Sequence, residues 1–130
     1  SKKVELGNLL AKRDWGYAPE YVEGIWKSLQ VKNSDDYVMA TNESHSVKEF
    51  VEEACKIANI SIKCLKINKK NFRPFDVNHL QGDYSKAKKK LGWKPKIKFI
   101  DLVKLMVDED IHRWEQRLKG KYLPWDAGNF

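Results

Sequence analysis

The sequence is poor in cysteine, with Cys55 and Cys64 the two in 130 residues. They lie nine positions apart and form no C-x-x-C pair, so the pattern indicates neither a disulfide framework nor a thiolate zinc site. The three histidines, His45, His79 and His112, show no metal-ligand spacing either. We therefore expect reduced thiols, no bound metal and a cytoplasmic location.

Long apolar runs are also missing. No segment approaches the roughly 20 apolar residues that a membrane-spanning helix needs, and no apolar signal region follows the charged start Ser1–Val4. No glycine-rich loop follows the first strand-like segment, which excludes a dinucleotide site built from these residues alone. We expect a protein without a membrane anchor.

Acidic residues are outnumbered, with 18 Asp and Glu against 25 Lys and Arg and a net charge of +7. Such an excess favours either a solvated basic face or an anionic ligand. Much of it comes from seven lysines close together, Lys86, Lys88, Lys89, Lys90, Lys94, Lys96 and Lys98. The sequence has no aromatic RNA-binding strand motif and no basic region followed by heptads, so nucleic-acid binding is disfavoured.

Length and composition predict one folded domain over residues 1–130, with a C-terminal tail over 119–130. A hydrophobic content of 42% suffices for a core, since a chain of this size buries roughly two-thirds of its unfolded surface. Periodicity predicts strands at 4–6, 37–40 and 60–64, and helices after Pro19, after Ser46, between Asp83 and Gly92, and over 99–118. This alternation indicates an α/β fold with a small, partly parallel sheet and about four helices.

Two tryptophans, Trp26 and Trp114, lie on apolar stripes at helical spacing. We expect both in the core. The helix after Ser46 is the clearest local prediction, because Ser46 and Glu49 form a capping box.

One polar segment, Asn71–Val77, joins an arginine and a carboxylate three positions apart. Pro74 disfavours helical backbone at Arg73, so Arg73 and Asp76 are expected on an extended segment. A guanidinium fits a phosphate, and a carboxylate accepts hydrogen bonds from sugar hydroxyls. Capping of a nearby turn is the alternative for Asp76.

A second basic cluster, Lys12-Arg13-Asp14-Trp15, lies sixty positions upstream of Arg73. Our hypothesis is that the fold brings Arg13 and Arg73 together around one diphosphate. The alternative for Arg13 is a surface ion pair with Asp14 or Glu20. Trp15 can serve equally as a core residue or as a wall of the nucleotide pocket.

These segments resemble the GDP-mannose 4,6-dehydratase family of extended short-chain dehydrogenases. The resemblance runs in order through nearly the whole chain, and its motifs are 6–9, 12–16, 37–41, 45–52, Phe72-Arg73-Pro74 with Val77, 82–88 and Leu91-Gly92-Trp93-Lys94-Pro95. It matches only the C-terminal, substrate-binding part of that family. The fold it implies is therefore that C-terminal domain, with the Rossmann half absent from these residues.

The resemblance implies a lyase reaction for a complete enzyme. NADP takes hydride from C4 of the mannose, water leaves across C5 and C6, and hydride returns at C6 to give GDP-4-keto-6-deoxymannose. The catalytic Thr, Glu, Tyr and Lys belong to the missing half, so the resemblance assigns no catalytic residue, no cofactor and no activity to this chain alone.

By position, the resemblance implies that Arg13 and Arg73 contact the diphosphate. Asp76 stands where the family usually has Glu, which holds the ribose hydroxyls, so one methylene of reach is lost. The region 63–70 is shorter than in the family. The implied ligand is GDP-mannose or a related GDP-sugar, and the partner is either a separate Rossmann half or a second copy of the chain.

Two alternatives stay open. The chain can be a fragment of another nucleotide-sugar epimerase, dehydratase or reductase with a different base or sugar. It can also be a non-catalytic remnant that serves as an assembly or polyanion-binding module.

Overall fold

The computed structural model describes residues 3–121 and has four α-helices and two small sheets in that range. Its elements run in the order β1 (Val4–Leu6), β2 (Lys12–Arg13), α1 (Ala18–Ser28), β3 (His45–Ser46), α2 (Val47–Ile57), η1 (Ile62–Cys64), β4 (Leu65–Ile67), η2 (Lys69–Asn71), α3 (Ser85–Leu91) and α4 (Phe99–Leu118), where η marks a 3-10 turn. Strands β1 and β4 are parallel, with Val4 opposite Leu65, and β2 and β3 are antiparallel. The predicted α/β class with a small, partly parallel sheet is confirmed.

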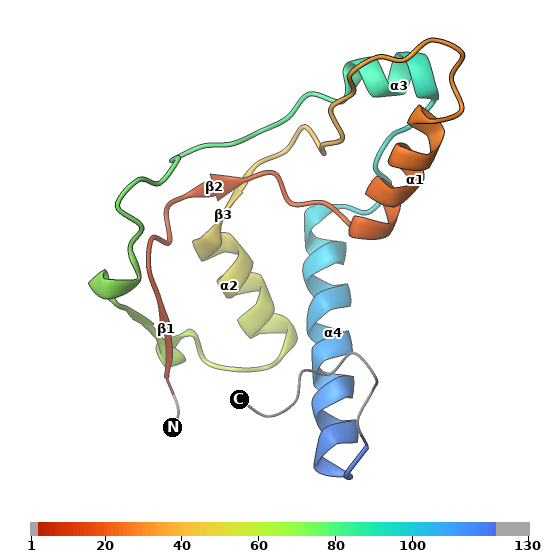
Figure 1. Ribbon diagram of the computed structural model, residues 1–130. Coiled ribbons are helices and arrows are strands. Elements are labelled where there is room, and N and C mark those ends of the chain that lie inside the picture. The colour runs from red at the N-terminus through yellow and green to blue at the C-terminus, as the bar shows by residue number, and fades with distance from the viewer. Residues whose placement is uncertain (1–2, 122–130) are drawn as a thin grey trace.

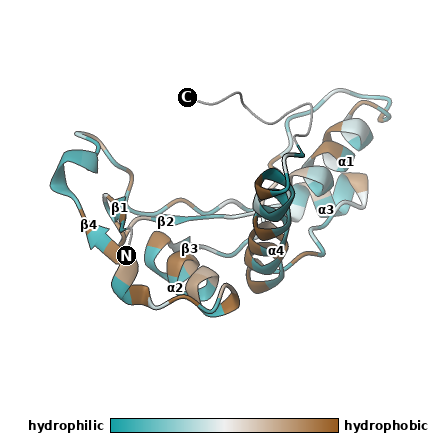
Figure 2. Ribbon diagram, turned by 90° about the horizontal axis from the view of Figure 1, so that it is seen from below, coloured by the Kyte–Doolittle hydropathy of each residue, from teal (hydrophilic) through white to brown (hydrophobic). Residues whose placement is uncertain are grey.

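Helix α4 divides the molecule. Figure 1 shows α1 and α3 on one side of it, and α2 with the two sheets on the other; Figure 2, which looks nearly along α4, shows the same division. Helix α2 packs along α4, and the second half of α4 continues beyond α2 (Figure 1). None of the helices within residues 3–121 is both long and apolar enough to cross a membrane.

Local sequence signals explain several helix ends. Ser46 accepts a hydrogen bond from the Glu49 amide at 3.1 Å and Glu49 bonds back to the Ser46 amide, which is the predicted capping box at the start of α2. Gly92 ends α3 with a φ of 63°, a left-handed conformation that glycine adopts without strain. Asp83 accepts from the Ser85 amide at the other end of α3.

Two of the three predicted strands are wrong in detail. Residues 37–40 form no strand; of them only Ala40 is buried, with its Cβ packed against Gly82. Residues 62–64 form the turn η1, and the strand starts later, at Leu65. The Ser61 hydroxyl accepts from the Lys63 amide at 3.3 Å, so a local turn replaces the ladder there.

The core lies where α1, α3 and the start of α4 meet. Trp93, expected only as part of a connector, is 1% exposed, and its Nε1 donates to the Glu20 carbonyl at 2.7 Å. Gly24 allows α1 to approach closely, because a Cβ there would lie 3.0 Å from Nε1 of Trp93. Other buried side chains are Ala87, Phe99, Leu102 and Val103.

The prediction that Trp26 and Trp114 are core residues is wrong, since each is 60% exposed. Both lie on apolar stripes that nothing else within residues 3–121 covers fully. The stripe on α1 consists of exposed Val22, Ile25, Trp26 and Leu29, and that on the second half of α4 of exposed Ile111, Trp114 and Leu118. Periodicity therefore identified apolar faces, but it did not show what they pack against. Of the predicted tail, residues 122–130 lie outside the described residues.

Candidate functional site

Arg13, Trp15, Arg73 and Asp76 all line one pocket of about 290 Å³. The pocket lies between the loop after β1, strand β2, the start of α2 and the segment after η2. Its other lining residues are Gly7, Asn8, Ala11, Val47 and Asn71. The fold thus brings the two arginines to the same hollow, although sixty positions separate them.

The parallel pairing of β1 and β4 builds one wall. The Asn68 amide donates to the Leu6 carbonyl at 2.8 Å, and the Asn71 side chain donates to the Glu5 carbonyl at 3.2 Å. Gly7 then passes directly against Asn71, where a Cβ on Gly7 would lie 2.8 Å from the carbonyl carbon. Only glycine fits this approach, which holds the Arg73 segment beside the end of β1.

Backbone pairing to β2 builds the other wall. The Lys12 amide donates to the Asn78 carbonyl at 2.8 Å, and the Leu80 amide donates to the Lys12 carbonyl at 3.0 Å. The chain that follows Asp76 therefore runs alongside β2, next to Arg13.

Arg13 is held in place by three acceptors. Its Nη2 donates to Oδ1 of Asp76 at 2.6 Å, and its Nη1 donates to the carbonyls of Val77 at 2.5 Å and Lys12 at 2.7 Å. The Asp76 carboxylate is itself oriented by Asn8, whose Nδ2 donates to Oδ2 at 3.1 Å. The predicted alternative, an ion pair of Arg13 with Asp14 or Glu20, is wrong.

Those two acidic residues have other partners. Asp14 accepts hydrogen bonds from the amide and hydroxyl of Thr41 and from the Gly82 amide. Glu20 accepts from the amides of Lys96 and Ile97 ahead of α4. Both carboxylates thus connect segments that are distant in sequence. Arg13 forms its ion pair with Asp76 instead.

Arg73 differs from Arg13 in its surroundings. It is exposed, lies outside any helix or strand, and takes part in none of the side-chain hydrogen bonds or ion pairs found within residues 3–121. The pocket therefore combines one guanidinium that is fixed by the protein with a second whose hydrogen-bonding capacity is unused.

Trp15 is both a packing residue and a wall of the pocket. Its ring stacks on Phe50 at 4.9 Å between centroids, and its Nε1 donates to the His45 carbonyl at 3.2 Å. The sequence left these two roles as alternatives, and the structure combines them.

Asn8 and Asn71 line the pocket but were given no role from the sequence. Asn8 orients Asp76 and Asn71 ties its own segment to β1. Asn8 stands in the motif 6–9 and Asn71 begins the polar segment 71–77, yet the contact of Asn8 with Asp76 spans 68 positions, and no local signal reveals it.

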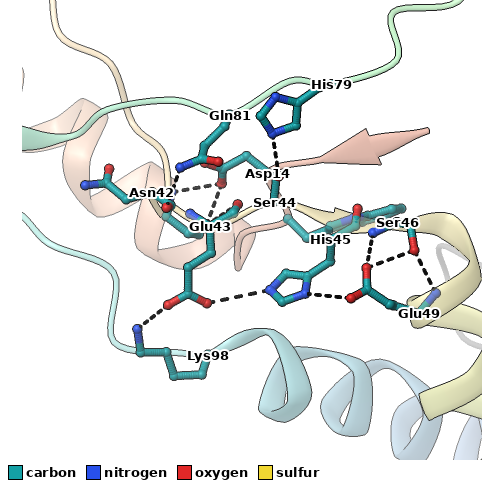
Figure 3. Close-up of polar contacts among 12 residues, drawn as sticks. Asp14, Asn42, Glu43, Ser44, His45, Ser46, Glu49, His79, Gln81 and Lys98 are labelled. Atoms are coloured by element: carbon teal, nitrogen blue, oxygen red, sulfur yellow. Dashed lines mark hydrogen bonds and ion pairs between the residues drawn. The ribbon is translucent and has the colours of Figure 1, made fainter. Parts of the chain in front are cut away.

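A second polar cluster joins β3 and the starts of α2 and α4, and its members include Glu43, His45, Glu49 and Lys98 (Figure 3). His45 stacks on Phe99 at 3.8 Å, with its ring nitrogens 3.7 Å from Glu43 and 4.0 Å from Glu49. A hydrogen bond from Lys98 holds the pKa of Glu43 below its usual value, and hydrogen bonds from the Ser46 amide and hydroxyl lower the pKa of Glu49. The cluster fixes the starts of two helices in place.

The described residues do not fit the pyrophosphate of NADP, which is held by a glycine-rich turn between a strand and a helix. Within residues 3–121, the strand that runs directly into an α-helix is β3, and its junction with α2 carries Ser46 and Val47. Of the pocket side chains, the arginines suit an anion and Asp76 suits hydroxyl groups.

Residues 1–106 match the family model described as GDP-mannose 4,6 dehydratase. GDP-mannose 4,6 dehydratase 1 of Arabidopsis thaliana is 53% identical over 110 residues, which are 84% of this chain and 30% of that protein. The GDP-mannose 4,6 dehydratase of Homo sapiens is 44% identical over 124 residues, which are 82% of this chain and 33% of that protein.

A crystal structure of dTDP-glucose 4,6-dehydratase from Bacillus anthracis, in complex with NAD, shares the fold. Its TM-score is 0.78 at 21% identity, over 88% of this chain and 36% of that one. The present chain thus spans about a third of the length of the proteins it matches. With a family model that matches most of its residues, this chain belongs to the GDP-mannose 4,6-dehydratase family.

Proposed function

We propose that the chain is the C-terminal, substrate-binding domain of a GDP-mannose 4,6-dehydratase-like protein, and that its pocket binds the diphosphate of GDP-mannose or a related GDP-sugar. The observation that carries the proposal is the pair of arginines on one pocket, Arg13 fixed and Arg73 without a partner among the described residues. Because the ligand carries a diphosphate, each guanidinium can contact one phosphate.

The energetics are consistent with a weak but specific site. Charge-assisted hydrogen bonds contribute about 1.5–3 kcal/mol each, and a micromolar complex needs about 8 kcal/mol in all. Arg13 and Arg73 would therefore supply much of such an affinity. In this proposal Asp76 accepts from the ribose hydroxyls, and Trp15 packs against the ligand.

The pocket volume indicates an incomplete site. At about 290 Å³ it lies at the small end of the range for ligand pockets, which is roughly 300–1,000 Å³. It suits a diphosphate with part of a sugar better than a whole nucleotide sugar. The remaining walls would come from a Rossmann half, supplied by the same or by another polypeptide.

The exposed apolar stripes on α1 and α4 support such a partner. Side chains as large as Trp26 and Trp114 are 60% exposed, and apolar patches of this kind commonly mark protein interfaces. We propose that a Rossmann half docks on these stripes in the cytoplasm and carries NADP and the catalytic groups. The chain alone would have no dehydratase activity, so incubation with NADP and GDP-mannose should give no product lighter than GDP-mannose by one water in mass spectrometry.

Isothermal titration with GDP, GDP-mannose, UDP and dTDP tests the ligand. We expect GDP and GDP-mannose to bind, with dissociation constants between micromolar and millimolar, and more tightly than UDP or dTDP. No heat from GDP at millimolar concentration would contradict binding by the chain itself.

Two other functions have specific support. The likeness to a dTDP-glucose 4,6-dehydratase favours a related enzyme for another nucleotide, and tighter binding of dTDP or UDP than of GDP would indicate it. The lysines between 86 and 98 favour an assembly or polyanion-binding module. Salt-dependent retention on a polyanion that GDP does not change would indicate that function.

A further inference from the structure

The two cysteines come together in the fold at a site separate from the arginine pocket. Cys55 lies near the end of α2, and Cys64 is the last residue of η1. Both line a groove of about 250 Å³ whose other residues are all apolar and come from β1, α2, β4, α4 and the turn after α2. Both are free thiols, and each is partly exposed.

The turn between them brings both cysteines to the same groove. Helix α2 ends at a left-handed Asn59, with φ of 53°, and the Ile60 amide donates back to the Cys55 carbonyl at 2.9 Å. The Cys64 amide then donates to the Ser61 carbonyl at 3.1 Å, which curls the chain into η1. The pKa of the Cys55 thiol is raised by burial, and further by the charge and side-chain hydrogen bond of Cys64. Both thiols therefore lie on the same groove.

We propose that Cys55 and Cys64 form a dithiol site that reacts with a small-molecule disulfide and closes to an intramolecular disulfide. This inference is independent of the proposed nucleotide binding. Spacing in the sequence gave no sign of it, because the contact depends on the left-handed turn at Asn59.

The reaction takes two exchange steps. Burial raises the pKa of the Cys55 thiol and so lowers its thiolate fraction, which favours Cys64 as the first nucleophile. The Cys64 thiolate attacks one sulfur of the oxidant, its S–S bond breaks, and the released thiolate takes up a proton. Cys55 then loses its proton to solvent and attacks the Cys64 sulfur, which releases the second oxidant thiol. Two protein thiols are oxidised and one disulfide is reduced to two thiols.

Closure would tie the end of α2 to the turn that leads into β4. Strand β4 pairs with β1, and β1 leads into Gly7 and Asn8 at the arginine pocket. The bond would therefore restrain the connection between α2 and the parallel sheet.

Oxidised glutathione added to the reduced full chain under native conditions tests the proposal by intact mass and peptide mapping. We expect the wild type to lose about 2 Da through a bond between Cys55 and Cys64. Cys55→Ser should stop at a mixed disulfide on Cys64, with a gain of about 305 Da, and Cys64→Ser should react more slowly than Cys55→Ser.

Three results would overturn the proposal. They are glutathione retained on both cysteines of the wild type, disulfide-linked dimers, and two free thiols in the native chain under conditions that oxidise the chain in urea. These readouts concern the wild type, so they hold even where a serine variant fails to fold. A second measurement is the melting temperature, which a closed bond should raise by roughly 5–10 °C; a fall would also contradict the proposal.

Discussion

Arg13 and Asp76 form an ion pair of 2.6 Å across 63 positions of sequence, with side chains 26% and 19% exposed. Both residues line the candidate pocket, and the pair orients Arg13 before any ligand binds. A guanidinium fixed in this way loses little side-chain entropy when it binds an anion. Because Asp76 is itself negatively charged, its effect on an anionic ligand has to be separated from its contact with Arg13.

Asp76→Asn separates the two roles of this carboxylate. Removing its charge should strengthen binding of inorganic pyrophosphate about fivefold, since a unit charge roughly 4 Å away in a water-exposed site contributes about 1 kcal/mol of repulsion. GDP should gain less or bind more weakly, because the ribose loses an acceptor. Titration of both ligands measures the difference, and Asp76→Glu should keep the ribose contact. Equal gains for GDP and pyrophosphate would show that Asp76 serves only Arg13.

Gly24→Ala should destabilise the fold by about 1–2 kcal/mol, measured by urea unfolding. Alanine stabilises a helix by about 1 kcal/mol relative to glycine, but overpacking a core destabilises the fold by about 1–3 kcal/mol. The new Cβ would lie 2.7 Å from Sδ of Met39 and 3.0 Å from Nε1 of Trp93. Trp93 is held by its bond to Glu20, so it cannot move away easily.

A double variant provides the control for Gly24. Met39→Ala removes one of the two clashing groups, so Gly24→Ala should cost less in the Met39→Ala background than in the wild type. An equal cost in both backgrounds would contradict the packing explanation.

Acid should weaken the starts of α2 and α4. The pKa values of Glu49 and Glu43 are lowered in the fold by the hydrogen bonds of Ser46 and Lys98. A lowered pKa means that the stabilisation is complete above the unfolded value, about 4.3 for Glu, and is lost as the pH falls through the folded value. The urea concentration at the midpoint of unfolding should therefore decrease once the pH drops below about 4.3. Both carboxylates are about half exposed, so each contributes less than about 1 kcal/mol.

Ser46→Ala is the matched control for the acid dependence. It removes the cap at a cost of about 1 kcal/mol at neutral pH, and it should reduce the loss of stability in acid in part, because Glu49 loses the hydrogen bond from the Ser46 hydroxyl and keeps the one from the backbone amide of residue 46. An unchanged acid profile would show that the hydrogen bond from the Ser46 hydroxyl is not responsible.

Trp26→Gln should leave the free energy of unfolding within about 0.5 kcal/mol of the wild type, since surface substitutions away from special features have small effects. Trp93→Ala, the matched buried change, should cost about 3–5 kcal/mol. Trp26→Gln should instead weaken association with a Rossmann half of a relative, measured by titration of the two parts. A large loss of stability in Trp26→Gln would mean that α1 buries this face in the isolated chain.

The sequence predicts those features whose cause is local. Ser46 with Glu49 marks the start of α2, and Gly92 marks the end of α3, because a cap depends on its immediate neighbours. The apolar run at 37–40 led to the wrong prediction of a strand. A strand also needs a partner strand, and none of the described segments pairs with these residues.

Long-range contacts explain the remaining misses. Trp93 is buried by elements distant in sequence, and periodicity in its own short segment does not indicate this. The faces of Trp26 and Trp114 were identified as apolar, but burial requires a covering surface. In the pocket, the residue types of Arg13 and Arg73 suggested an anion site, whereas the role of Asn8 depends on a partner 68 positions away.

The effect of Arg73→Ala on the dissociation constant of GDP tests the central claim most directly. Arg73 is exposed and unpaired within residues 3–121, so its loss should not change stability. Loss of a charge-assisted contact of about 1.5–3 kcal/mol should weaken GDP binding at least about tenfold. Lys70→Ala, an exposed cation three positions away that does not line the pocket, should have little effect. Unchanged binding in Arg73→Ala, or an equal loss in Lys70→Ala, would contradict a diphosphate held between the two arginines.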